Sequence, residues 1–143
     1  MAERIVEMAK IHGFEQLRVY QMAEELTDRV WDIVQTWQSF AKDTIGKQFV
    51  RSANSVGANI AEGPGRGSYQ DHRRFVRIAR GSLYETKHWL RRAYKRNLLT
   101  EEQVNSLKPL LDELPPKLNA YLNSIGDYSL VIRLWSFVTV ATA

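Results

Sequence analysis

The 143-residue sequence contains no cysteine, only four prolines and only three histidines. Without cysteine the chain has no disulfide, thiolate metal site or cysteine nucleophile, which fits a reducing compartment such as the cytoplasm. The longest apolar run, about a dozen residues near the C-terminus, falls short of the roughly twenty that a membrane span needs. The N-terminus alternates charged with apolar residues and does not resemble a signal peptide. We therefore expect a cytoplasmic protein outside the membrane.

Acidic residues are scarce in the middle of the chain. The formal net charge is +4, but residues 51–96 hold eleven basic side chains and three acidic ones, so this stretch carries +8 and the remainder −4. A chain polarised in this way is expected to meet an anionic partner through one part of its surface.

Apolar residues recur every three or four positions in four segments, which predicts an all-α protein with four amphipathic helices. We expect an antiparallel up-and-down four-helix bundle over residues 1–125, followed by an apolar C-terminal extension, residues 126–143. We expect the extension to be buried against an apolar groove of the bundle or against a neighbouring subunit, because an exposed apolar segment would promote aggregation. The expected helices are residues 14–40, 46–62, 68–97 and 101–125.

Local signals mark the ends of these helices. The sequence Gly63-Pro64-Gly65 is expected to end the second helix, because proline cannot continue a helix and glycine readily takes the left-handed cap conformation. Ser68 is a good N-cap for the third helix. Thr100 and Gln103 have the spacing of a capping box, which predicts the start of the fourth helix. Three prolines lie in that helix, so we expect one helical path with a kink or break.

The third helix separates a cationic face from an apolar one when its residues are projected at 100° per residue. Few acidic residues are interleaved, and like charges at i, i+4 repel, so an anionic partner is expected. That partner is either a phosphate backbone or an acidic helix, such as the first-helix face around Glu24, Glu25, Asp28 and Asp32. The cationic stripe consists of Arg73, Arg77, Arg80, Tyr84, Lys87, Arg91 and Lys95.

Two short motifs do not support a catalytic or cofactor site. The loop "GPGRG" lacks the Lys-Ser/Thr of a P-loop and follows a helix instead of a strand, so Arg66 is expected at most to help hold an anion at the next helix start. Glu85 and His88 have the Glu-x-x-His spacing of di-iron bundles, but a single copy that flanks the basic face predicts no metal. No catalytic constellation is evident, so we expect no enzyme activity and no cofactor.

Three stretches of the sequence resemble a known family. They are "FEQLRVYQMAEEL", "RSANSVGANIAEGPGRGS" and "FVRIARGSLYETKHWLRRAYKRNLLTEEQ". In their order and motifs they resemble the bacterial four-helix-bundle proteins encoded within intervening sequences of large-subunit ribosomal RNA genes. The resemblance implies a ring- or barrel-shaped homo-pentamer without known enzyme activity. It also implies kinship with the accessory variability protein of diversity-generating retroelements, which binds nucleic acid and a reverse transcriptase.

Some residues that match the family pattern are expected to serve the fold or the assembly. Gly81 and Ser82 would allow close helix approach, and Asn59 and Glu62 would cap or bridge helices. The positions concerned are Asn59, Glu62, Gly63, Gly81, Ser82 and Glu85.

The function expected from these observations is non-enzymatic binding of RNA or DNA by a bundle oligomer. Arg66 and the cationic stripe would contact phosphates, and Tyr84 would stack on a base. The alternative is a protein-interaction scaffold or an accessory subunit of a reverse transcriptase.

Overall fold

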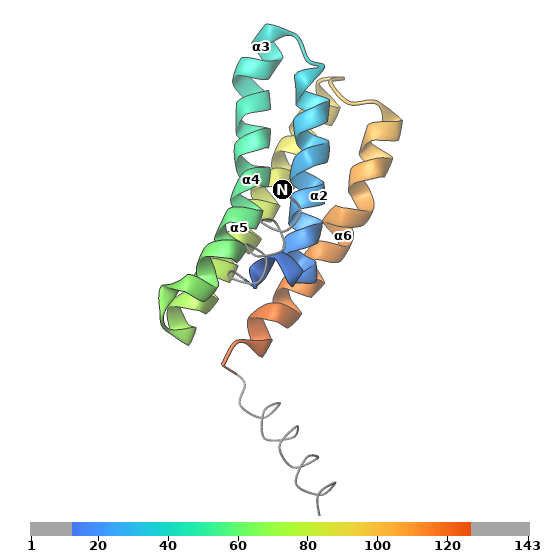
Figure 1. The fold of residues 1–143 in the computed structure, drawn as a ribbon. Coiled ribbons are helices and arrows are strands. Elements are labelled where there is room, and N and C mark those ends of the chain that lie inside the picture. The colour runs from blue at the N-terminus through green and yellow to red at the C-terminus, as the bar shows by residue number, and fades with distance from the viewer. Residues whose placement is uncertain (1–12, 127–143) are drawn as a thin grey trace, which may run out of the picture.

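The computed structural model describes residues 13–126, and these residues form helices and turns without any strand. Four long helices, α2 (Arg18–Gln35), α4 (Lys47–Glu62), α5 (Tyr69–Lys95) and α6 (Glu101–Ser124), lie side by side in Figure 1. The predicted all-α bundle is therefore confirmed. None of the helices in this part of the chain is long and apolar enough to cross a membrane. The apolar extension expected at 126–143 lies, apart from Gly126, outside the described residues.

The first helix is shorter than the predicted range 14–40. A 3-10 turn, η1 (Phe14–Gln16), precedes α2, and α2 ends at Gln35. The Thr36 hydroxyl donates to the Ile33 carbonyl at 2.7 Å, and Gln38 has an extended backbone that starts the next helix. No glycine or proline marks this turn, so the apolar periodicity continues across it, and the predicted helix 14–40 is wrong over residues 36–40.

The second helical stretch begins earlier than the predicted residue 46. Helix α3 (Ser39–Ala41) leads into a π-helical segment, η2 (Lys42–Gly46), which continues into α4 without an extended residue. The widened π-turn lies where this stretch meets the C-terminal end of α2. A Cβ on Gly46 would come within 2.8 Å of the Val34 Cγ1 atom. The absence of a side chain at Gly46 therefore allows this stretch to pack closely against α2.

The connection between α4 and α5 corrects the assignment of the helix-ending glycine. Helix α4 ends at Glu62 as predicted, but Gly63 keeps right-handed helical angles at the start of a 3-10 turn, η3 (Gly63–Arg66). The left-handed residue is Gly67, with φ 85°. The Ser68 hydroxyl then accepts the Asp71 backbone N–H at 3.1 Å, which confirms the predicted N-cap.

The fourth helix begins at the predicted capping box. The Thr100 hydroxyl accepts the Gln103 N–H at 3.1 Å, and the Gln103 side chain accepts the Thr100 N–H at 3.0 Å. Helix α6 then runs through its three prolines as one helix, so the expected single helical path is confirmed and the alternative of a break is not observed. Its buried leucines, which face the core, are Leu107, Leu110, Leu111, Leu114, Leu118 and Leu122.

Two helices of the bundle lie diagonally opposite each other. Helix α2 packs against α4 and α6, and α5 packs against the same two helices. A single apolar core fills the space between the four, with Met22, Leu26, Phe49, Ile60 and Leu83 almost fully buried. The outer surfaces of α2 and α5 therefore face opposite sides of the molecule.

Candidate nucleic-acid interface

The structure divides the cationic stripe of α5 into two groups. On the side facing α6, the Arg73 guanidinium donates to the Ile125 carbonyl at 2.8 Å, and Arg80 donates to Asn119 Oδ1 at 2.9 Å. Both side chains are half-buried. They connect α5 to the C-terminal half of α6, so these two arginines already have partners within the bundle.

The remaining cations of the stripe project from the bundle. Arg77, Arg91 and Lys95 are exposed, and within residues 13–126 none of them has a hydrogen bond or an ion pair. Tyr84, also exposed, lies between them along the helix, with the Lys87 ammonium 5.5 Å from its ring centroid. These five residues form what we call the α5 ridge, a row of cations around one aromatic ring.

Arg66 belongs to a separate cluster at the start of α5. Its guanidinium lies 2.9 Å from one Asp71 oxygen and 3.5 Å from Glu62, and it covers the Phe75 ring at 4.8 Å. Hydrogen bonds from Arg66 and then Arg74 hold the pKa of Asp71 below its usual range. Because two acidic groups neutralise Arg66, its guanidinium is less available to an anion than the α5 ridge is.

The acidic face of α2 does not neutralise the α5 ridge within one molecule. Glu24, Asp28 and Asp32 are exposed on α2, and α2 lies diagonally across the bundle from α5. An acidic helix therefore meets the ridge only if it comes from another molecule.

Residues that match the family pattern line the contact between α4 and α5. Ser82 is buried and its hydroxyl donates to Ser55 Oγ at 2.9 Å, while Thr86 donates to the Ser82 carbonyl at 2.8 Å and lies 3.1 Å from Ser52 Oγ. Small side chains let the two helix backbones approach closely here. The Asn59 amide donates to the Ser55 carbonyl at 2.7 Å, so it supports its own helix and does not bridge two helices.

Two other residues of that pattern differ in their surroundings. Glu85 accepts from Arg51 of α4 at 2.5 Å and from the Trp89 indole at 3.2 Å, so it ties α5 to α4. Gly81 is exposed, and a Cβ there would meet no atom within 4 Å. The expectation that Gly81 permits close helix packing is therefore wrong within one molecule.

A histidine is packed into the end of the bundle where α4, α5 and α6 meet. The His72 Nε2 atom lies 3.0 Å from the Tyr121 hydroxyl, and its ring contacts Gly63. Burial, followed by the charge of the adjacent Arg73, lowers the pKa of His72 below 6.5. The folded protein therefore favours the neutral ring more than the unfolded chain does.

This lowered pKa predicts a pH-dependent stability. The contribution of His72 is complete above the unfolded pKa of about 6.5 and is lost as the pH falls through the lower folded value. We expect the urea midpoint to decrease between pH 7.5 and pH 5, and His72→Gln to flatten that decrease. The exposed His88→Gln variant should keep it. An unchanged pH profile in His72→Gln would contradict the assignment.

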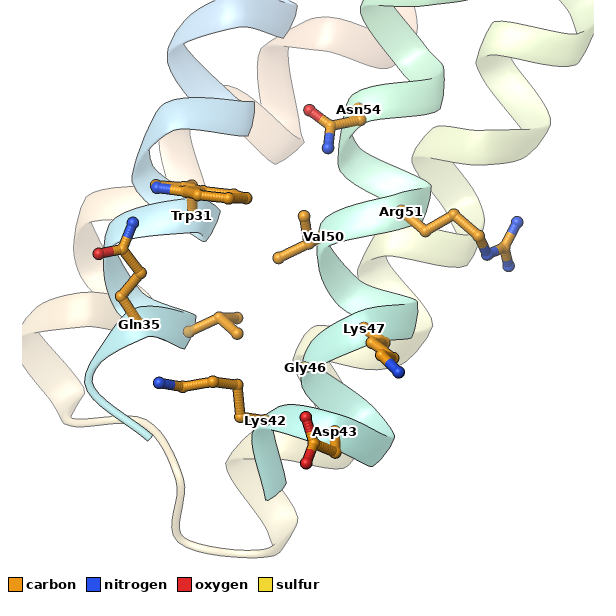
Figure 2. Close-up of a pocket in the computed structure, with 10 residues that line it drawn as sticks. Trp31, Gln35, Lys42, Asp43, Gly46, Lys47, Val50, Arg51 and Asn54 are labelled. Atoms are coloured by element: carbon orange, nitrogen blue, oxygen red, sulfur yellow. The ribbon is translucent and has the colours of Figure 1, made fainter. Parts of the chain in front are cut away.

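A groove that the sequence reasoning missed lies between α2 and α4. Its volume is about 540 Å³, and Figure 2 shows Trp31 on α2 facing Val50 and Asn54 on α4 across it. Gln35 completes its α2 side, and Lys42 of η2 lies at its end. The signal was weak, because an exposed tryptophan in an acidic helix follows no motif and the π-helical turn beside it has no sequence signature.

The described residues contain no group of three or more histidine, aspartate or glutamate side chains placed to hold a metal ion. Glu85 is engaged by Arg51 and Trp89, and the His88 ring packs edge-on against Trp89 at 4.8 Å. Both residues of the Glu-x-x-His spacing therefore contact neighbouring side chains of the bundle.

Fold and surface together define a small all-helical bundle with one basic helix face. The family model for the 23S rRNA-intervening sequence protein matches residues 15–120, and the chain belongs to this family. A solved structure from Bacteroides thetaiotaomicron, described as a protein of unknown function from the S23 ribosomal protein family, is 25% identical. It covers 74% of this chain and 99% of its own, with a TM-score of 0.65. No curated protein matches the sequence.

Proposed function

We propose that this protein binds nucleic acid, RNA or DNA, through the α5 ridge, without enzymatic activity and in the cytoplasm. The observation that carries the proposal is the set of exposed cations, Arg77, Arg91 and Lys95, which have no acidic partner among the described residues. Lys87, Arg91 and Lys95 follow one another at i, i+4, where like charges repel, and a phosphate backbone relieves that repulsion while releasing its counterions.

The shape of the ridge also favours a polynucleotide over a small anion. Arg77 and Lys95 are eighteen residues apart on α5, a rise of about 27 Å at about 1.5 Å per residue. A single phosphate group meets one or two of these cations, whereas a chain of phosphates meets all of them. Tyr84, between them, offers an exposed ring on which a base can stack.

The direct test removes three charges from the ridge. The variant Arg77→Gln/Arg91→Gln/Lys95→Gln should bind RNA about 100-fold more weakly near 0.1 M salt and lower the log–log salt slope by about 2 to 3, because each phosphate contact contributes about 0.7 to 0.9. Fluorescence anisotropy over a salt series measures both quantities.

A matched control changes the same charge elsewhere. The single variant Arg91→Gln is compared with Arg18→Gln, which removes an exposed cation from α2, the helix diagonally across the bundle from α5. Arg18→Gln should weaken binding less than Arg91→Gln does, because charges beyond a Debye length of about 8–10 Å are screened. Equal losses in the two variants would show that binding reflects net charge and not the ridge.

A second candidate function is a protein-interaction scaffold, including an accessory subunit of a reverse transcriptase. It is favoured by the exposed acidic face of α2 around Glu24, Asp28 and Asp32, which complements the ridge of another molecule. The antiparallel bundle would then assemble head to tail into a ring, such as the homo-pentamer that the resemblance implies. Light scattering measures the oligomer, and nuclease-treated pull-downs separate protein partners from those bridged by RNA.

A further inference from the structure

We propose that the groove between α2 and α4 binds an unpaired base of a single-stranded nucleic acid, with Trp31 as the stacking platform. The inference rests on the proposed function and adds a second contact site to it. The Trp31 side chain is 52% exposed, and among residues 13–126 no aromatic ring or hydrogen-bond partner engages it. An indole that is half open to solvent beside a groove has a free face for a planar ligand.

The groove has the size and floor of a small-ligand site. Its volume of about 540 Å³ lies within the range of roughly 300–1,000 Å³ typical of such sites. Val34 and Val50 form an apolar floor, and the contact between Gly46 and Val34 closes one end. The π-helical turn beside it is a kind of irregularity that often accompanies functional sites.

Two amide side chains provide polar recognition next to the indole. Gln35 follows Trp31 by one helical turn on α2, and Asn54 projects from α4 toward the same space in Figure 2. Both side chains are exposed and have no hydrogen-bond partner among the described residues. An amide offers a donor and an acceptor together, which is what the edge of an unpaired base requires.

Charge on the α4 side of the groove suits the phosphates of the same strand. Lys42, Lys47 and Arg51 lie on that side with the carboxylate of Asp43. The exposed carboxylates Asp28 and Asp32 flank Trp31 on α2, so the phosphates would follow the α4 side. In Figure 2 Arg51 extends away from the groove, and it pairs there with Glu85 of α5. Neighbouring helices lie about 8–10 Å apart, so a short strand can run from the groove over α4 to the α5 ridge.

These features favour a single strand over the other occupants of an apolar groove. Bases inside a duplex are stacked on both faces and cannot cover Trp31. An apolar segment, from residues 127–143 or from a second copy, would fill the floor but leave the amides and Lys42 without partners, which is unfavourable.

The test compares Trp31→Ala with Trp31→Phe by anisotropy, using a labelled oligouridine and an RNA duplex of equal length. Stacking contributes about 1–3 kcal/mol per base, so Trp31→Ala should weaken oligouridine binding about 5- to 150-fold, with partial recovery in Trp31→Phe. Duplex affinity should not change. The matched control is Phe40→Ala, which removes an aromatic ring that is 83% exposed outside the groove and should not change either affinity.

A second measurement locates the contact directly. Ultraviolet cross-linking of an oligomer containing 4-thiouridine should label the tryptic peptide 30–42, which contains Trp31. Labels restricted to α5 peptides, or unchanged oligouridine affinity in Trp31→Ala, would overturn the inference. The inference would also be overturned if Trp31→Ala changed the sedimentation of the protein without changing its oligouridine affinity. The groove would then be a contact between two copies of the chain.

The results also distinguish this inference from the function on which it rests. Oligouridine binding that depends on the ridge cations but not on Trp31 leaves the proposed function standing and removes the groove. A wild-type protein that binds neither probe contradicts the proposed function itself, and the inference with it.

Discussion

Phe49→Ala is expected to destabilise the protein by about 3–5 kcal/mol, because it leaves a cavity at the centre of the bundle. The Phe49 side chain is fully buried on α4, and its ring stacks on Trp37 with centroids 6.3 Å apart. Its neighbours come from a well-packed core that collapses only in part around a cavity. Urea unfolding followed by circular dichroism measures the loss as a lower midpoint at constant slope.

The matched control for this prediction is Phe40→Ala, nine residues earlier on the same helical stretch. The Phe40 side chain is 83% exposed on α3, so its removal should change the free energy of unfolding by no more than about 0.5 kcal/mol. If the two variants were equally destabilised, Phe40 would be covered in solution, for example by a second copy. That outcome would be visible as a change in sedimentation.

Gly63→Val is expected to cost about 3 kcal/mol by overpacking the end of the bundle. A Cβ at this position would lie 2.6 Å from His72 Cδ2 and 3.4 Å from the His72 carbonyl oxygen. The ring cannot simply turn aside, because its Nε2 atom lies 3.0 Å from the Tyr121 hydroxyl. The substitution should therefore separate α5 from the turn after α4, and thermal unfolding should show a lower midpoint.

Gly65→Val is the control for the same turn. A Cβ on Gly65 meets nothing within 4 Å, and its φ is not in the left-handed region. Neither steric contacts nor the backbone angle requires glycine at this position. The free energy of unfolding of Gly65→Val should therefore stay within about 0.5 kcal/mol of the wild type. A strong effect at Gly65 and none at Gly63 would contradict the assignment of His72 as the neighbour that requires glycine.

Local signals predicted the parts of the fold that depend on adjacent residues. The Ser68 cap and the Thr100–Gln103 capping box are bonded as expected, because each involves atoms within one helical turn. The turn after α2 has no such local signal, because it contains neither glycine nor proline. Only the packing of the Ser39–Glu62 stretch against α2 requires the chain to reverse there, so the sequence did not predict the turn.

The candidate site was predicted in outline and corrected in detail. The helical projection placed the α5 cations on one face, but it gives a side chain's direction only relative to its own axis. Which neighbour lies in that direction depends on the other helices. Arg73 and Arg80 therefore proved to be bonded to α6, while Arg77, Arg91 and Lys95 stayed exposed.

The sequence by itself determined four amphipathic helices, the N-caps of α5 and α6 and a polarised charge distribution, because periodicity and capping act over a few residues. Tertiary structure alone decided which cations are free, why Gly63 and Gly46 are small, and that Trp31 borders a groove. These features arise between helices that are distant along the chain. Their contacts depend on how the helices pack, which no local pattern encodes.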